Sequence, residues 1–325
     1  MRRREKRKLT GRQVAAIIAM DVFVLVAILA YLKYQRERPY DPSFDTSVAA
    51  PAYTESGPIV LYDEGHRNTH TVKGGYRPFA ELVRNDGYDL RVNRDPFTPQ
   101  TLDGVDLLVI VLAQGANDSN DEPAFSGSEI DVVDGWVRGG GSLLLVTDHW
   151  PYGAANETLA ERFGVRMGKG LVEDMQHFEP DRGESHLVFS EENGLLRDHP
   201  IIRGRTSGER IRRVLTFTGQ SLIGPPASVA FLSLSEGATE RPPTAPQVDK
   251  SGGNVRVTME YGDPAALSGA AQGLAFEHGS GRVVVLGEAG MLRAEKDDDL
   301  LVGMNVPGFD NRQLALNIAH WLSRV

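Results

Sequence analysis

The sequence contains no cysteine among its 325 residues. This absence excludes disulfide bonds, thiolate zinc and iron–sulfur sites, and any mechanism with a cysteine nucleophile. The chain also has no GxSxG elbow, no Walker or GxGxxG phosphate loop, and no HExxH or EF-hand spacing. Its apolar fraction of 41% and charged fraction of 24% are typical of a folded globular protein, so the chain is not disordered throughout.

Charge is distributed unevenly along the chain. The formal net charge is −9, but residues 1–38 carry ten basic and three acidic side chains, which leaves 25 basic and 41 acidic side chains for the remainder. The remainder therefore has a net charge of −16. A surface this acidic repels a phosphate backbone, so we expect no nucleic-acid partner.

The N-terminal region predicts a membrane anchor. Residues 14–32 form an apolar run broken only by Asp21, and nineteen residues at about 1.5 Å each span a hydrocarbon core of about 30 Å. Most of the neighbouring basic residues precede this run, so the positive-inside rule places the N-terminus in the cytoplasm. We predict a cytoplasmic tail over 1–13 and a single transmembrane helix over 14–34 that holds the rest of the chain outside the cytoplasm, at the cell membrane.

Two alternatives remain open for this region. A cleaved signal peptide is the competing interpretation, but its apolar region should be only about 7–15 residues long, and the best small-residue cleavage site, at 48–50, lies far downstream. Asp21 either contacts a partner helix within the membrane or lies close enough to the cytoplasmic side to reach water.

The remainder of the chain predicts a linker and one α/β domain. Residues 35–57 mix proline, serine and charge without periodicity, which is typical of a linker. Residues 58–325 alternate strand-like and helix-like runs, and the nearly continuous apolar strands favour a parallel sheet covered on both faces. We therefore predict an α/β fold, a three-layer sandwich with a mostly parallel central sheet. The strand-like runs are 58–62, 88–93, 106–112, 142–147, 272–277 and 282–287, and the main helix-like runs are 76–86, 126–138, 157–163 and 311–324.

Local sequence signals mark the starts of two of these helices and predict one surface loop. Ser126 and Glu129 have the spacing of a capping box at the start of a helix. Asp310 is the expected N-cap of the last helix, with Gln313 in the capping-box position. Residues 236–253 are rich in proline and glycine and predict a surface loop.

Polar residues follow three of the predicted strands. In open α/β sheets, ligands bind beyond the carboxyl ends of the strands, and neighbouring strands bring their ends together. The polar residues at these strand ends could together hold a divalent metal ion, for which His66, Asp148 and His149 are the candidates. They could instead supply a general acid and base. The residues after the first strand are Asp63, Glu64, His66, Asn68 and His70, those after the fourth are Asp148 and His149, and Glu288 follows the run 282–287.

The same residues have structural interpretations. A carboxylate that follows a strand often caps the next turn, and a histidine at this position is often hydrogen-bonded within the protein. The sequence is compatible both with a reactive cluster and with a set of structural groups.

Several motifs resemble those of the class I glutamine amidotransferase-like superfamily. Within it, the chain is similar to a bacterial membrane-anchored family akin to the soluble domain of gliding-motility-type ABC transporter auxiliary proteins. The resemblance implies a flavodoxin-like or glutamine amidotransferase-like sandwich and a transporter or envelope partner. The matching motifs are YDEGHRNTHT (62–71), residues 124–136 with GGGS (139–142), VTDHWP (146–151), HPI (199–201), TFTGQ (216–220), GEAGM (287–291), GMN (303–305) and NRQ (311–313).

The superfamily's amidotransferases place a catalytic cysteine at the turn after the strand equivalent to 142–147. Here that turn contains Asp148 and His149, so glutamine hydrolysis by a thiolate is excluded. The favoured function is a membrane-tethered ligand-binding or assembly domain, with Asp63, Glu64, Asn68, His70, Asn305 and Asn311 as ligand-binding candidates. The alternative is a metal- or base-assisted hydrolase with His66, Asp148, His149 and Glu288 as catalytic candidates.

Overall fold

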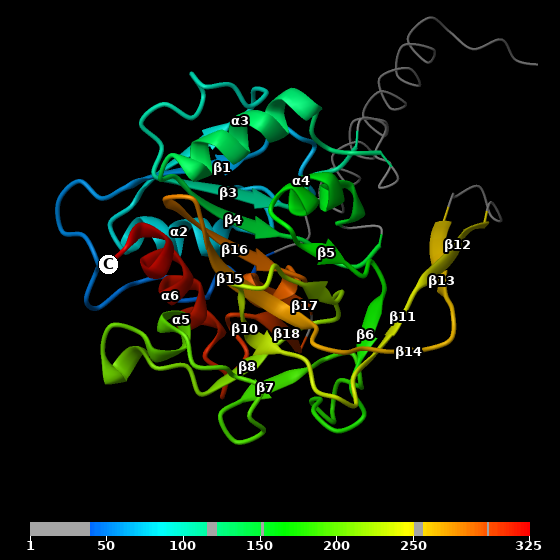
Figure 1. Ribbon diagram of the computed structural model, residues 1–325. Helices are drawn as coiled ribbons and strands as arrows, with labels where there is room; N and C mark the ends of the chain where they lie inside the picture. The colour runs from blue at the N-terminus through cyan, green and yellow to red at the C-terminus, as the bar shows by residue number, and fades with distance from the viewer. Residues whose placement is uncertain (1–39, 116–121, 151–152, 250–255, 298) are drawn as a thin grey trace, which may run out of the picture. The chain divides into compact units, whose positions relative to one another are not determined.

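The apolar runs form the inner strands of one mixed sheet (Figure 1) in a computed structural model that describes residues 40–115, 122–150, 153–249, 256–297 and 299–325. The strand order is β2-β1-β3-β4-β16-β15-β9-β5, and β10 pairs with β15. The strands are β1 (Ile59–Asp63), β2 (Asp89–Asn93), β3 (Leu107–Val111), β4 (Ser142–Val146), β5 (Arg166–Met167), β9 (Leu222–Ile223), β10 (Val229–Ser233), β15 (Ala271–His278) and β16 (Gly281–Leu286).

The first five strands of this order are parallel, and the others run antiparallel to their neighbours. The parallel part, β2-β1-β3-β4-β16, has the 2-1-3-4-5 order of flavodoxin-like folds. The prediction of an α/β fold with a largely parallel central sheet is therefore confirmed.

Helices cover both faces of the sheet. Side chains of β3 alternate between two hydrophobic cores, with Leu107 and Val109 in one and Leu108 and Ile110 in the other. Helices α2 and α6 contribute to the first core and α3 and α4 to the second, which gives the three layers that alternating burial requires. The helices are α2 (Arg77–Asn85), α3 (Gly127–Arg138), α4 (Glu157–Arg162), α5 (Pro200–Arg203) and α6 (Asn311–Ser323).

Helix α3 begins as the sequence predicts. The Ser126 hydroxyl accepts a hydrogen bond from the Glu129 amide, and the Glu129 carboxylate accepts one from the Ser126 amide. The capping box is therefore confirmed.

Asp310 is the N-cap residue of α6, as predicted, but its side chain does not form the capping hydrogen bond. Its carboxylate accepts the amides of Arg212 and Arg213 at 2.7 and 3.1 Å. Gln313 instead donates to the side chain of Asn317. The carboxylate joins α6 to β8 (Arg213–Leu215), a long-range contact that spacing along the chain does not reveal.

Most of the loop predicted at 236–253 is strand in its described part. Its residues form β11 (Thr239–Arg241) and β12 (Pro243–Asp249), and β12 pairs with β13 (Arg256–Tyr261) in a hairpin. Prolines are tolerated there because β12 is an edge strand. The other short strands are β6 (Leu171–Glu173), β7 (Val188–Ser190), β8 (Arg213–Leu215), β14 (Ala265–Ala266), β17 (Ala294–Asp297) and β18 (Leu300–Gly303).

The described part of the predicted linker, 40–57, packs against the domain. The Asp41 amide donates to the Ala294 carbonyl at 2.7 Å, and the Tyr53 ring meets the Tyr88 ring edge-on with centroids 5.1 Å apart. Aromatic and backbone anchors therefore fix a segment whose composition suggests a linker.

The predicted transmembrane helix, 14–34, lies outside the described residues. In the part of the chain that the structure describes, no helix is long and apolar enough to cross a membrane.

Candidate functional site

The structure divides the predicted catalytic cluster into two groups. Strands β4 and β16 are direct neighbours, so Asp148 and Glu288 lie side by side at the carboxyl edge of the sheet. Strand β3 separates β1 from β4, so the loop that carries His66 starts about 10 Å from β4. The single cluster of His66, Asp148, His149 and Glu288 is thus replaced by a β1 group and a β4–β16 group.

In the β1 group, His66 lies between two carboxylates. Its Nδ1 atom is 2.9 and 3.0 Å from the two oxygens of Asp63, and its Nε2 atom is 2.8 Å from Oε1 of Glu129. The imidazole is buried and packs against the rings of Phe97 and Phe125, both with centroids 4.6 Å away. Both ring nitrogens therefore have partners inside the protein.

Electrostatics agree with this geometry. Burial alone would lower the pKa of His66, but the hydrogen bonds and charges of Asp63 and Glu129 outweigh it and raise the pKa. Burial alone would raise the pKa of Glu129, but hydrogen bonds from His66 and Ser126 outweigh it and lower the pKa to about 2. An imidazolium that donates from both nitrogens offers no lone pair to a metal or a substrate proton. The β1 group is a structural link between the β1 loop and α3.

Two other candidates fix the same loop. Glu64 accepts the Val72 amide at 3.0 Å and forms an ion pair with Arg94 at 2.8 Å. The Asn68 amide group donates to the carbonyl of Val111, at the end of β3. Both side chains hold the fold of the loop after β1.

In the β4–β16 group, carboxylates accept three successive backbone amides. The Ala289 amide donates to Asp148 at 3.0 Å, the Gly290 amide donates to Glu288, and the Met291 amide donates to Glu288 at 2.7 Å. Glu288 is completely buried, and its burial together with the charge of Asp148 raises its pKa well above the usual value. This pair fixes the turn after β16.

Tyr76 also contacts the turn after β16. Its hydroxyl donates to the Ala289 carbonyl at 2.6 Å, and its ring stacks on the imidazole of His70 with centroids 5.2 Å apart. Burial, with the nearby charge of Glu288, raises the pKa of Tyr76. The tyrosine is therefore a buried hydrogen-bond donor at this position.

His149 is the half-buried member of the β4–β16 group. Its Nδ1 atom lies 2.5 Å from Oδ1 of Asp148, and its ring faces Tyr261 with centroids 6.3 Å apart. Among the described residues, no group of three or more histidine, aspartate or glutamate side chains is arranged to hold a metal ion. The metal candidates His66, Asp148 and His149 are accordingly split between the two groups.

The two asparagine candidates also make structural contacts. Asn305 donates to the Asp41 side chain at 3.1 Å and to the Glu295 carbonyl at 3.0 Å. Asn311 accepts the Leu215 amide at 3.0 Å and donates to the Leu215 carbonyl at 2.7 Å. They attach the N-terminal segment and α6 to the domain.

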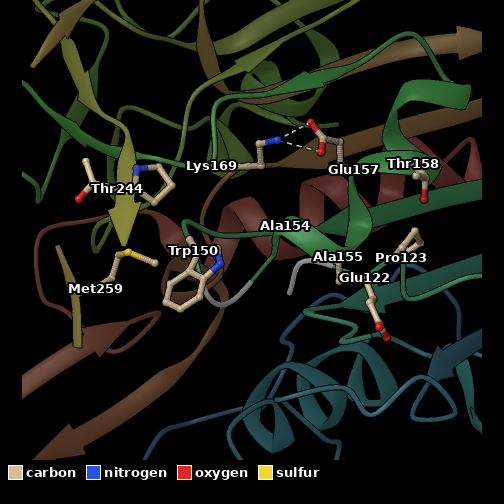
Figure 2. A pocket seen from close by; sticks show the side chains of 11 residues that line it. Glu122, Pro123, Trp150, Ala154, Ala155, Glu157, Thr158, Lys169, Thr244 and Met259 are labelled. Carbon is tan, nitrogen blue, oxygen red and sulfur yellow. Dashed lines mark hydrogen bonds and ion pairs between the residues drawn. The ribbon is translucent and has the colours of Figure 1, made fainter. Parts of the chain in front are cut away.

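A groove that none of these candidates lines lies next to the β4–β16 group (Figure 2). Its volume is about 540 Å³, within the usual range of ligand sites, about 300–1,000 Å³. The walls come from the segment after β4, the start of α4, the turn between β5 and β6, and the β12–β13 hairpin. The lining residues are Glu122, Pro123, Trp150, Ala154, Ala155, Glu157, Thr158, Lys169, Pro243, Thr244 and Met259.

Lys169 is held in the groove by a strained and well-anchored turn. Its φ angle is 63°, a left-handed conformation that few residues other than glycine adopt. The buried Gln220 side chain accepts the Lys169 amide at 2.8 Å, and the buried Glu240 carboxylate accepts the Gly170 amide at 3.0 Å. A side chain in place of Gly168 would collide with Glu240. Backbone strain that the surroundings enforce is a feature of functional sites.

Trp150 and Lys169 are positioned together. The Trp150 amide donates to the Lys169 carbonyl at 3.0 Å, and the Trp150 carbonyl accepts the Tyr261 hydroxyl at 3.0 Å. The Lys169 ammonium lies 2.8 and 2.9 Å from the two oxygens of Glu157, the contacts drawn as dashed lines in Figure 2. The groove thus presents an aromatic ring and an ion pair.

These residues are not among the candidates that the sequence predicts. Trp150 directly follows Asp148 and His149, and Lys169 stands between two glycines, a signal of a tight turn. The residues that build the turn lie about fifty and seventy positions further along the chain.

Comparison with known proteins establishes a shared fold. No protein-family model matches the chain, and no curated protein matches it. The mmIFT52 N-terminal domain superposes with a TM-score of 0.56 at 15% identity, over 81% of this chain and 97% of that domain. At this identity the likeness shows the fold alone.

Two further solved structures cover similar shares of the chain. A cytoplasmic protein from Salmonella typhimurium LT2 is 15% identical over 82% of this chain and 99% of its own, with a TM-score of 0.44. A ThuA-like protein from Bacteroides uniformis ATCC 8492 is 13% identical over 87% of this chain and 95% of its own, with a TM-score of 0.39.

Proposed function

We propose that residues 40–325 form an amidotransferase-like domain that binds a ligand in the groove beside Trp150 and performs no amide hydrolysis. One observation carries the proposal. The buried polar groups at the ends of β1 and β16 are bonded to the protein itself, whereas Trp150, Glu157 and Lys169 line an open groove. A site that keeps its reactive groups inside and displays a pre-formed groove is suited to recognition.

The absence of the superfamily's cysteine nucleophile supports the same function. The chain has no cysteine, and the turn where the superfamily's amidotransferases carry theirs contains Asp148 and His149. Asp148 bonds to the Ala289 amide and to the ring of its neighbour His149.

A ligand screen tests this function. We expect ligand-detected NMR on a library of amino acids, nucleosides, polyamines, organic acids and sugars to find binders that are not turned over. Trp150→Ala should abolish their binding because it removes the largest apolar surface of the groove. Trp136→Ala is the matched control, since Trp136 lies on α3 and does not line the groove. The proposal fails if no compound binds in a Trp150-dependent manner.

We further propose that the domain is tethered to the outer face of a cell membrane by residues 14–34, with a transporter or envelope component as partner. The charge difference across the apolar run supports this orientation. In a bacterial host, a reporter that is active only in the cytoplasm should be silent when fused after Val325 and active when fused before Met1. Activity of the C-terminal fusion would reverse the topology.

The alternative is a hydrolase, and one contact favours it. The 2.5 Å approach of Asp148 Oδ1 to His149 Nδ1 is the arrangement in which a carboxylate orients a general base. Such an enzyme would release a product in the same screen, and His149→Ala would abolish the product. A stoichiometric metal ion after purification without chelator, lost in His149→Ala, would support the metal-assisted form.

A further inference from the structure

We infer that the groove binds a neutral polyhydroxylated ring, such as a hexose unit of a saccharide. This inference rests on the proposed function and adds the chemical class of the ligand. It is drawn from three properties of the groove: an aromatic ring on an anchored backbone, a paired donor and acceptor, and an excess of carboxylates that disfavours anions.

The backbone of Trp150 is anchored before any ligand arrives. Its amide donates to the Lys169 carbonyl and its carbonyl accepts the Tyr261 hydroxyl, and its half-buried side chain lines the groove with Met259 and Pro243. A hexopyranose has a face of C–H groups that packs against an aromatic plane, while its hydroxyls point outward around the ring. A pre-positioned tryptophan offers that packing at little entropic cost.

The ion pair matches the hydroxyls of such a ring. Each sugar hydroxyl both donates and accepts, so it can bond to an ammonium and a carboxylate at once. The Lys169 and Glu157 side chains, each about one-third exposed, present these two functions next to one another. The buried hydroxyl oxygen of Thr158, which also lines the groove, has no hydrogen-bond partner among the described residues.

Charge in the groove selects against anionic ligands. An anion would meet the carboxylates of Glu122 and Glu157 and a chain whose net charge from residue 39 onward is −16. A neutral ligand avoids this repulsion and keeps the ion pair intact.

A set of matched oligosaccharides tests the inference. Intrinsic tryptophan fluorescence and calorimetry on the full chain, kept in a detergent without a sugar headgroup, would compare three neutral hexasaccharides: maltohexaose, cellohexaose and N-acetylchitohexaose. Chitosan hexamer supplies the N-acetylchitohexaose backbone with free amines, and hexagalacturonate supplies carboxylates. We expect at least one neutral hexamer to bind with a Kd of about 0.1–1 mM. Hexagalacturonate should bind at least about tenfold more weakly.

Variants assign the binding to the groove. Trp150→Ala should weaken binding at least about tenfold. Lys169→Met and Glu157→Gln should each weaken it roughly threefold to tenfold, the range for one hydrogen bond. Trp136→Ala should leave the affinity unchanged, and thermal melting verifies that each variant is folded.

Two results would overturn the inference. The first is that no neutral hexamer binds in a manner that depends on Trp150, or on Lys169 if Trp150→Ala does not fold. The second is that a charged hexamer binds as tightly as the best neutral one. If the inference falls while charged compounds of the ligand screen still bind through Trp150, the proposed binding function stands and only the ligand class is wrong. If nothing binds through Trp150, both fall.

Discussion

Replacing His66 by leucine should lower the free energy of unfolding by about 3 kcal/mol, because the change leaves the buried carboxylate of Asp63 without its cation. Urea denaturation of the wild type and the variant measures the difference. Arg203→Leu is the control: it breaks an ion pair with Asp198, whose side chain is 80% exposed. Its loss should be about 1 kcal/mol or less.

The pH dependence of stability provides a second readout for His66. Its pKa is raised in the folded state, so its contribution is complete below the unfolded value of about 6.5 and is lost as the pH rises through the folded pKa. The free energy of unfolding of the wild type should therefore fall above about pH 6.5, and the slope should be shallower in His66→Leu. Equal slopes in the two proteins would contradict a charged His66 between Asp63 and Glu129.

Replacing Glu288 by alanine should cost about 3–4 kcal/mol, because the Gly290 and Met291 amides lose their acceptor inside a fully buried site. The removed side chain also leaves a cavity. Glu277→Ala is the matched control: it lies in β15, and its side chain is 70% exposed. Its effect should remain within about 0.5 kcal/mol.

The outcome that contradicts this interpretation is specific. If Glu288→Ala is as stable as the control but loses ligand binding or turnover, the carboxylate is a functional group and not the support of the turn.

The central sheet could be predicted because its strands are nearly continuous apolar runs. Strands β3 and β4 are buried along their whole length, a pattern that parallel sheets covered on both faces impose. The packing of 40–57 and the strands within 236–253 could not be predicted, because both depend on distant partners. Tyr53 packs against Tyr88, and β12 pairs with β13, and neither contact leaves a periodic signal.

The candidate site could be predicted only as a region. The polar residues after β1, β4 and β16 do lie at the carboxyl edge, as the rule for open sheets requires. Their roles depend on partners that the spacing cannot supply: Glu129, which holds His66, comes from α3, 63 positions away. Lys169 was missed for the same reason, because Gln220 and Glu240 build its turn from two later segments.

We propose that recognition takes place in the Trp150 groove and that the histidines and carboxylates at the sheet edge support the fold. The most direct test measures the affinity of the best neutral hexasaccharide for the wild type, Trp150→Ala and His66→Leu, each well below its melting temperature. We predict that Trp150→Ala loses at least about tenfold in affinity with little change in stability, whereas His66→Leu loses stability and keeps its affinity. The opposite result, with binding abolished by His66→Leu and unchanged by Trp150→Ala, would contradict recognition in the Trp150 groove.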